Sequence, residues 1–376
     1  MKFLIITHVV HRYKNGFYYA YGPYVREMNI WLRLVDEVIV LAPLAKLDPP
    51  DPIDIPYQHD NLRIVSVPHF SLTSPGQVLN SFWKVPLIFF KVFRQMKSSD
   101  HIHLRCPGNM GLVGCFTQIF FPNKVKTTKY AGNWDPASNQ PFTYRLQQWI
   151  LRNQVLTKNM KILVYGTWPH EPPSIHPFFT ATYSEREKED VPDRQIRKDK
   201  TIRLIFVGGL FDGKQPLLSA SVLKILRGRG YDVRLDIFGE GPERKKIEHF
   251  IEENNLHDYI IMHGNVSAEQ VKYAYKKAHF LIFISKSEGW PKAVAEAMFW
   301  GCVPVTSPVS CVPQMLGNGE RGELVPSDVD QIVFRLEKLL ESPNVYREKS
   351  LNAATWSRQF TMDRFESEIS SFLQKG

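Results

Sequence analysis

The sequence lacks the features of membrane-spanning and secreted proteins. No run approaches the roughly 20 apolar residues that a helix needs to cross a bilayer. The start, MKFLIITHVVHRYK, is too short and too interrupted for a signal peptide, and it predicts a first strand instead. We therefore expect a cytoplasmic protein whose contact with a membrane, if any, is peripheral and at the inner face.

Cysteine is scarce, and no metal motif is evident. The four cysteines form no CxxC pair, and no Cys/His cluster has the spacing of zinc ligands. No Asp-x-Asp motif stands at the end of a predicted strand. We expect reduced structural thiols, no metal and no bound cofactor.

Negative charge is also in deficit, since 47 Lys and Arg face 38 Asp and Glu, for a net charge of +9. A basic balance favours nucleic acid, anionic membranes or phosphorylated ligands as partners, without choosing among them. No recognised nucleic-acid-binding module appears, so we expect no nucleic-acid partner. At 376 residues the chain is long enough for two domains, each with its own core.

Apolar strands alternate with helices along the chain, which predicts an α/β fold with parallel sheets. In the first half we expect a strand at Phe3–Ile6, a long loop at Thr7–Gly22 and a closing strand at Thr180–Tyr183. The charged stretch from Ser184 to Lys200 predicts an exposed connector. The expected domains are therefore 1–184 and 201–356, joined by a linker at 185–200, with a last helix in 357–376.

One strand–loop–helix unit dominates the second half. The apolar run His279–Ser285 predicts a buried parallel strand. A loop with Glu288 and Gly289 follows, and Pro291 favours a helix start. The unpaired N–H groups and the dipole at such a helix start suit a phosphate.

Two carboxylates flank that helix start. Glu288 lies in the loop and Glu296 in the second turn of the helix. A carboxylate can accept two hydrogen bonds side by side, which suits the paired hydroxyls of a ribose or a hexose. Taken alone, each of the two could be an ordinary solvated charge. The neighbouring Gly289 and Pro291 favour the interpretation that they bind sugar hydroxyls.

The segment EGWPKAVAEAM, with seven residues between Glu288 and Glu296, resembles the E-x7-E motif of retaining glycosyltransferases of family GT4. The following GCVPVTSP and GELVP are also similar to that family. The resemblance covers nearly the whole second half and the first half more loosely. It implies the GT-B fold, which has two Rossmann-like, doubly wound domains facing a cleft, with the last helix crossing back to the first domain.

The resemblance also implies the activity. We expect a hexosyltransferase-type enzyme that moves a sugar from a UDP- or GDP-sugar to a glycan or lipid-linked acceptor, in surface polysaccharide or lipopolysaccharide synthesis. The first domain would serve the acceptor and the second the nucleotide sugar.

Site roles follow from the same resemblance. Glu288 would hold the sugar and Glu296 the ribose, and Lys214 would neutralise the leaving diphosphate. Asn133 follows the predicted strand Lys126–Ala131, where family members carry a histidine near the sugar, and its alternative role is a structural Asx-turn. The remaining donor-binding candidates are Gly208, Gly209, Gly264, Asn265, Gly289, Trp290, Pro291, Lys292 and Ala293.

The sequence departs from the family at two loops. Gly209 stands where an arginine usually grips the diphosphate, so backbone N–H groups, Lys292 or Arg105 would have to replace it. The first loop has the single Gly16 where two adjacent glycines are usual. In that loop, His8 and His11 are candidates to reach an acceptor or are structural.

Three alternatives were weighed. The residues from Gly208 to Lys214 have the spacing of a P-loop, but Gln215 replaces the Ser or Thr that would hold Mg²⁺. An enzyme of the same fold with other chemistry, such as a nucleotide-sugar epimerase, stays open. The aromatic and basic stretch 79–97 predicts either a core helix with snorkelling lysines or a helix lying on an anionic membrane, and a pure nucleic-acid or membrane binder is less favoured.

Overall fold

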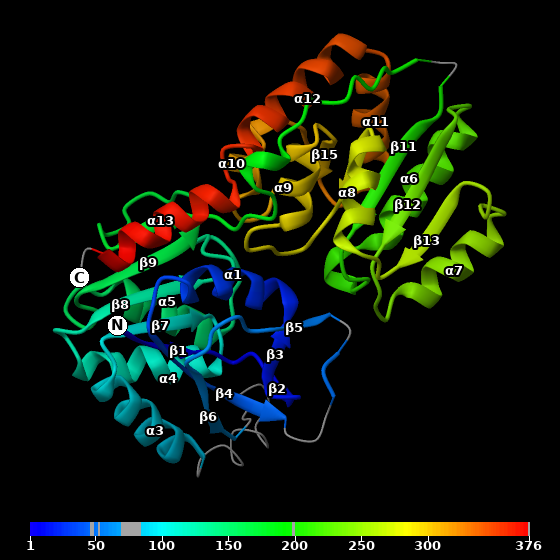
Figure 1. Ribbon diagram of the computed structural model, residues 1–376. Coiled ribbons are helices and arrows are strands. Elements are labelled where there is room, and N and C mark those ends of the chain that lie inside the picture. Colours follow the sequence, from blue (N-terminus) through cyan, green and yellow to red (C-terminus); the bar gives the residue numbers. More distant parts are fainter. Residues whose placement is uncertain (46–48, 52, 69–83, 198–199, 375–376) are drawn as a thin grey trace. The chain divides into compact units, whose positions relative to one another are not determined.

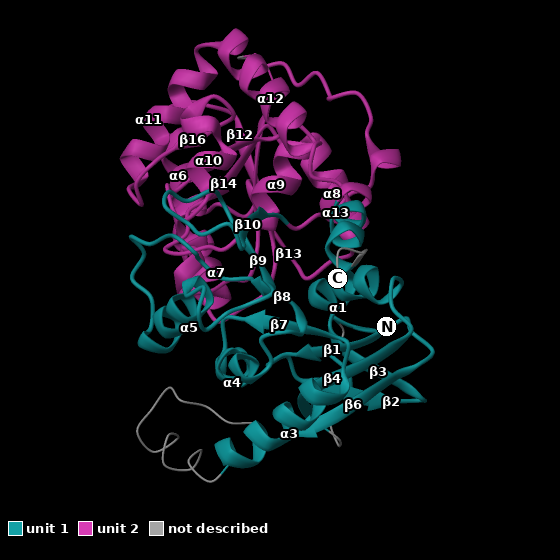
Figure 2. Cartoon of the chain, turned by 90° about the vertical axis from the view of Figure 1, so that its left-hand side faces the viewer, with its two compact units in different colours: residues 1–179, 365–376 teal, residues 180–364 magenta. Residues whose placement is uncertain are grey.

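The computed structural model describes residues 1–45, 49–51, 53–68, 84–197 and 200–374. The chain forms two compact units (Figure 2). Unit 1 comprises Met1–Phe179 and Phe365–Gly376, and unit 2 comprises Thr180–Arg364. Part of the predicted stretch 79–97 lies outside the described residues.

Unit 1 is built on a sheet whose parallel strands run in the order β10-β9-β8-β7-β1-β4-β6 (Figure 1). The chain starts in the middle at β1, moves outward to β4 and β6, and then returns to fill the other side. Such an order is that of a doubly wound fold. The strands are β1 (Lys2–Ile6), β4 (Glu37–Ala45), β6 (Leu62–Val67), β7 (His101–Cys106), β8 (Val125–Tyr130), β9 (Met160–Tyr165) and β10 (Ile175–Phe178).

The described helices of unit 1 bury one face each against this sheet or against one another. They are α1 (Gly22–Leu32), α3 (Lys84–Ser98), α4 (Asn109–Thr117), α5 (Phe142–Arg152) and most of α13 (Met362–Gln374). The 3₁₀ turn η1 (Gln118–Phe120) follows α4. Helix α13 contacts the sheet through Phe365, whose ring lies 5.3 Å from that of Phe178 in β10.

The first loop is more ordered than we predicted. Thr7–Gly22 contains the antiparallel strands β2 (His11–Lys14) and β3 (Phe17–Tyr21), and β3 also pairs with β5 (Asp54–Pro56). Asn15 and Gly16 have φ of 51° and 86°, which suits the two central residues of a type I′ turn. The prediction of a plain loop was wrong, because an Asn-Gly pair within a stretch rich in aromatic residues is itself a hairpin signal.

Unit 2 has a six-stranded parallel sheet in the order β13-β12-β11-β14-β15-β16. This is the doubly wound order 3-2-1-4-5-6, which reverses between β11 and β14. The strands are β11 (Ile202–Val207), β12 (Val233–Phe238), β13 (Ile260–Gly264), β14 (Phe280–Phe283), β15 (Val303–Thr306) and β16 (Glu323–Leu324).

Two groups of helices accompany this sheet. One group is α6 (Pro216–Gly228), α7 (Arg244–Glu253) and α11 (Val329–Leu340), and the other is α8 (Ala268–Lys277), α9 (Lys292–Phe299) and α12 (Pro343–Ser357). Shorter turns are η2 (Glu185–Glu187), η3 (Asp212–Lys214), α10 (Val312–Met315) and η4 (Gly317–Gly319). The predicted helix start at Pro291 is displaced by one residue, since Pro291 is the N-cap of α9.

The region expected to join two domains differs from the prediction. Residues 180–183 form no strand, and β10 is the last strand before unit 2. The expected linker 185–200 is part of unit 2. Arg194 fixes it there by donating to the carbonyl of Gly301 at 2.7 Å and to that of Lys276 at 3.0 Å. A charged stretch can thus be anchored when its arginine finds the unpaired carbonyls at helix ends.

Candidate active site

The loops that follow β11 and β14 lie together at the point where the strand order of unit 2 reverses. Because β11 and β14 are paired neighbours, their carboxyl ends are adjacent. The backbone N–H of Lys286 and the hydroxyl of Ser285 both donate to the carbonyl of Gly213, at 2.9 and 3.1 Å. Two segments far apart in sequence thus form one rigid edge.

Lys214 and Glu288 meet on this edge as an ion pair. The Glu288 side chain is 8% exposed and that of Lys214 is 29% exposed. The Lys214 ammonium also lies 4.7 Å from the ring centre of Phe283, which adds a cation–π contact. A buried acid thereby holds a half-exposed cation that an incoming anion can reach.

Glycines allow the next loops to pack closely around the ends of β11, β12 and β13. A Cβ at Gly239 would overlap the carbonyl oxygen of Gly208. The amide of Gly208 donates to the carbonyl of Phe238 at 3.0 Å, and the amide of Gly239 donates to that of Gly264 at 2.9 Å. Gly239 has φ of 132°, which side chains rarely adopt. Three predicted or neighbouring glycines thus keep backbone rather than side chains at the strand ends.

Gly209 stands at the position where an arginine was expected. The ring of Phe211 lies so close to Gly209 that a Cβ there would overlap it. Phe211 itself is 54% exposed. The other cation of this edge, Lys286, pairs with Asp212 at 2.6 Å. Of these two lysines, Lys214 is therefore the one that pairs with the buried carboxylate of Glu288.

Helix α9 presents its first turn directly after the Glu288 loop. Ala293 is buried, and Glu296 is half-buried in the second turn. Oε1 of Glu296 accepts a hydrogen bond from the hydroxyl of Thr182 at 2.7 Å. Burial first, and the Glu296 carboxylate second, raise the pKa of Tyr275 well above its ordinary value. Glu296 is thus held in place by the hydroxyl of Thr182, which comes from a distant part of the sequence.

The residues between Glu288 and Glu296 are supported by contacts with Cys311 and Trp356. The carbonyl of Gly289 accepts from the thiol of Cys311 at 3.2 Å. Trp290 stacks on Trp356 of α12 with ring centres 6.1 Å apart. Pro291 is buried and Lys292 is half-buried. This support leaves the backbone of the loop, rather than the Trp290 ring, as the surface at the helix start.

Two further candidates, Asn133 and Arg105, belong to unit 1. Oδ1 of Asn133 accepts from the amide of Asp135 at 2.9 Å, which makes an Asx-turn. Arg105 is paired with Glu27 at 2.7 Å and is 13% exposed, so its charge is already balanced. In the same unit, His11 is buried and bonds Tyr57 at 2.8 Å, as a structural residue does.

Sequence reasoning missed Thr182, Phe283 and Phe211. Thr182 was assigned to a strand that does not exist, and nothing in its neighbourhood signals a contact with Glu296. Phe283 lies in the apolar run of β14, where every residue resembles core. Phe211 stands two residues after Gly209 in the sequence, but this spacing does not predict that the Phe211 ring packs against the glycine.

Asn265 follows Gly264 at the end of β13 and is exposed. Among the described residues, no group of three His, Cys, Asp or Glu is placed to hold a metal ion. Likewise, none of the helices in the described part is long and apolar enough to cross a membrane.

Comparison with known proteins places these observations in a family context. The family model "Glycosyl transferases group 1" matches residues 187–356. A Salmonella typhimurium protein named "Putative colanic acid biosynthesis glycosyltransferase WcaL" is 27% identical over 183 residues, which cover 46% of this chain and 45% of that protein. The matched part spans about half or less of the length of the first curated relatives.

Several solved structures align over the whole of this chain, among them the following two. Sucrose-phosphate synthase from Thermosynechococcus elongatus aligns with a TM-score of 0.67 at 18% identity, covering 100% of this chain and 98% of that one. HepE of Anabaena, in complex with UDP and glucose, aligns with a TM-score of 0.66 at 13% identity and covers 100% of both chains. At these identities the likeness establishes the fold, and the predicted GT-B fold is confirmed.

Proposed function

We propose that this protein is a retaining glycosyltransferase that uses a nucleotide-sugar donor, because residues 187–356 match the family model of the group 1 glycosyl transferases. The observation that carries the proposal is the Lys214–Glu288 ion pair, which stands where the strand order of unit 2 reverses. Ligands of open α/β sheets bind at that point. Here a cation, a buried acid and a helix start lie on adjacent loops.

The donor is a UDP- or GDP-sugar. Its diphosphate would lie against the first turn of α9 and the ammonium of Lys214, where N–H groups and positive charge favour an anion. Its ribose would bind Glu296, and its base would pack at Gly264 and Asn265. The UDP found in the Anabaena structure supports a uridine nucleotide as the first donor to test.

The proposed reaction is the one that the resemblance to retaining glycosyltransferases implies. The bond between the anomeric carbon and the diphosphate oxygen breaks while the acceptor oxygen bonds to the same face of the sugar. The acceptor proton passes to the leaving diphosphate. Lys214 stabilises the negative charge that develops there, which is an electrostatic role. Glu288, released from part of its contact with Lys214, would accept hydrogen bonds from sugar hydroxyls.

The acceptor is a glycan or a lipid-linked glycan, in a pathway of surface polysaccharide or lipopolysaccharide synthesis. The relation to a protein named for colanic acid biosynthesis supports this class. Unit 1 also exposes apolar side chains beside basic ones. Helix α3 buries Ile88, Val92 and Met96, whereas Leu87 and Phe90 are 52% and 68% exposed.

This exposed face of α3 continues onto η1, where Phe120 is 62% exposed and lies 6.0 Å from Phe89, ring centre to ring centre. Lys97 lies in the last turn of the helix. Apolar rings with lysines beside them suit the headgroup region of an anionic membrane. We therefore place peripheral membrane contact on this face, while the opposite face of α3 belongs to the core.

A thermal-shift screen against UDP, GDP, ADP and their sugars tests the donor. A nucleotide that binds the folded protein raises its melting temperature by mass action. Product analysis with and without an acceptor then tests the reaction, because an epimerase would convert the donor without an acceptor. No shift with any nucleotide diphosphate, or sugar conversion that ignores the acceptor, would contradict the proposal.

A further inference from the structure

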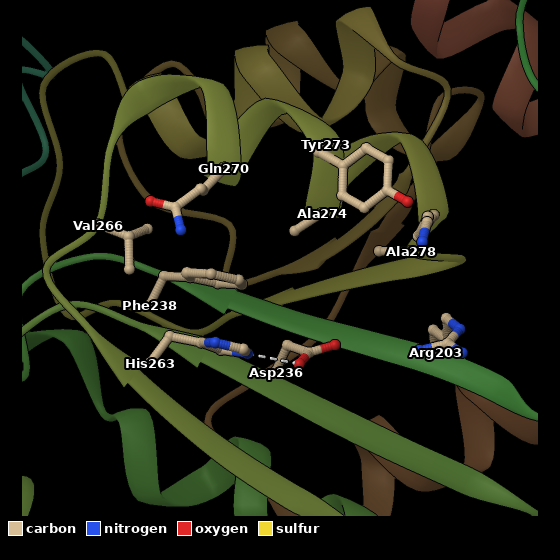
Figure 3. Close-up of a pocket in the computed structure, with 10 residues that line it drawn as sticks. Arg203, Asp236, Phe238, His263, Val266, Gln270, Tyr273, Ala274 and Ala278 are labelled. Carbon is tan, nitrogen blue, oxygen red and sulfur yellow. Dashed lines mark hydrogen bonds and ion pairs between the residues drawn. The ribbon is translucent and has the colours of Figure 1, made fainter.

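Unit 2 contains a pocket that the proposed reaction does not use. It has a volume of about 260 Å³ and lies between helix α8 and the sheet strands β11, β12 and β13 (Figure 3). The floor comes from side chains of the strands, and the roof from Gln270, Tyr273 and Ala274 of α8. Of the residues at and after the end of β13 that are candidates to contact the base of the donor, Val266 lines the pocket, whereas Gly264 and Asn265 do not.

One end of the pocket is aromatic. The rings of Phe238 and His263 are stacked, with centres 4.3 Å apart and planes 3° apart. Figure 3 shows Phe238 between His263 and α8, so one face of its ring is turned toward the helix. A second flat ring can stack there, since aromatic pairs favour such separations.

Polar groups beside these rings are fixed in position. His263 Nε2 and Asp236 Oδ1 are 2.6 Å apart, which holds the histidine ring parallel to Phe238. Oε1 of Gln270 accepts from the amide of Ser267 at 3.1 Å as part of a capping box. The Gln270 amide nitrogen is consequently turned toward Phe238 (Figure 3). The site offers a positioned hydrogen-bond donor next to a ring face.

The other end of the pocket is cationic. Arg203 of β11 and Lys277 of α8 line it, and both are exposed. Neither forms an ion pair with an acid in the described part of the chain, although the Lys277 ammonium lies 4.0 Å from the ring centre of Tyr273. Asp236 is the acid among the lining residues, and it is bonded to His263. The cationic end is thus left with positive charge to offer an anion.

We propose that this pocket binds a small aromatic anion, a planar ring that carries a phosphate or a carboxylate. The ring would stack on Phe238, and the anionic group would bind Arg203 and Lys277. An arginine fork and a nearby ammonium suit either anion. The volume fits one ring with one such group, and it is smaller than a pocket for a large ligand.

The test is calorimetric titration of the full-length protein with phenyl phosphate. We expect a dissociation constant of about 1 mM or tighter. Cyclohexyl phosphate, which has no flat ring, and inorganic phosphate, which has no ring at all, should each bind at least about tenfold more weakly. Equal binding of all three would reduce the site to a plain anion contact and overturn the proposal, as would no binding of phenyl phosphate at all.

Substitutions of the residues that line the pocket test whether phenyl phosphate binds there. Arg203→Gln and Lys277→Gln should each weaken phenyl phosphate binding about tenfold, and Ala274→Trp should abolish it by filling the roof. Lys245→Gln is the matched control, because Lys245 is an exposed lysine on α7 outside the pocket. Unchanged affinity in the first three variants would overturn the assignment.

Competition separates this pocket from the donor site. Saturating UDP should leave phenyl phosphate binding unchanged. Displacement of the probe by UDP would place it in the donor site and overturn the proposal. Because the readout is binding of phenyl phosphate alone, the result does not depend on whether the protein transfers a sugar.

Discussion

The ammonium of Lys214 and the carboxylate of Glu288 form an ion pair across 74 residues of sequence. The two side chains come from loops after β11 and β14, which are neighbours only because the sheet order reverses between them. The pair keeps a largely buried acid neutralised until an anion approaches the lysine. Five predictions follow from this and from the other contacts of the site.

Removing either charge of this pair should disable transfer. Glu288→Gln keeps the shape of the side chain and should lower kcat by about 10²-fold or more, as the loss of a positioned polar group in an active site does. Lys214→Ala should have an effect of similar size. The measurement is steady-state transfer with the donor found in the screen.

The control for that experiment is Lys246→Gln. Lys246 forms an exposed pair with Glu243 at 2.8 Å, and such surface pairs contribute little. Its activity should equal that of the wild type. Full activity in Glu288→Gln, with the control also active, would remove Glu288 from the site.

Thr182 should act as a positioning residue for Glu296. Thr182→Val removes the hydroxyl that donates to Glu296 at 2.7 Å but keeps the volume. We expect KM for the donor to rise several-fold, by the value of about one hydrogen bond, with kcat nearly unchanged. Thr182→Ser should restore KM. A fall in kcat with unaltered KM would argue against positioning of the ribose-binding acid.

The contact between Gly239 and Gly208 should tolerate no side chain. Gly239→Ala places a Cβ against a backbone oxygen that cannot move aside, and we expect a loss of about 2 kcal/mol or more in stability, with weaker nucleotide binding. Gly213→Ala is the matched control, because nothing lies within 4 Å of its Cβ. Denaturant titration checks both. Equal stabilities of the two variants would refute close packing at the strand ends.

Stability should fall as the pH is lowered from 7 to 5. Burial lowers the pKa of His11, His101 and His279 to about 4. In the unfolded chain a histidine titrates near 6.5, so between about pH 6.5 and 4 the unfolded state binds more protons than the folded one. In this window each histidine lowers the free energy of unfolding by up to about 1.4 kcal/mol for each pH unit of acidification. Above about pH 6.5 this loss of stability is absent.

The measurement is the slope of unfolding free energy against pH. His101→Gln should flatten this slope by one proton, whereas the surface variant His249→Gln should leave it as it is. His249 is 70% exposed, so its loss changes little in the folded state. An unchanged slope in His101→Gln would show that His101 is protonated in the folded protein.

The exposed face of α3 should bind anionic vesicles. Phe90→Asp places a charge at the most exposed ring of that face and should reduce cosedimentation with phosphatidylglycerol vesicles about tenfold. Val155→Asp is the control, because Val155 is 77% exposed on a turn after α5. Equal loss in both variants, or no vesicle binding by the wild type, would remove the membrane from this face.

Much of the fold could be predicted because its strands are apolar runs closed by glycine or proline. The predicted strands Phe3–Ile6 and Lys126–Ala131 match β1 and β8 to within one residue at each end. The failures came where local chemistry competes with composition. Asn15-Gly16 makes a hairpin of a polar loop, and Arg194 anchors a segment whose charge density predicted a free connector.

The candidate site was less accessible to sequence reasoning. The spacing of Glu288 and Glu296 and the position of Lys214 could be predicted, because they lie in a motif and at a strand end. Their partners could not. The contacts of Lys214 with Glu288 and of Thr182 with Glu296 join distant segments, and they depend on which strands become neighbours. The Asx-turn at Asn133, in contrast, was one of the two interpretations that its sequence context offered.

The division of the chain has a consequence for biosynthesis. Unit 2 is one continuous segment inserted into unit 1, whose last part, Phe365–Gly376, is synthesised only after the whole of unit 2. Phe365 and Ile369 are almost fully buried, so the core of unit 1 is incomplete until they emerge from the ribosome. The amino-terminal unit, although synthesised first, must therefore be the one that finishes folding last.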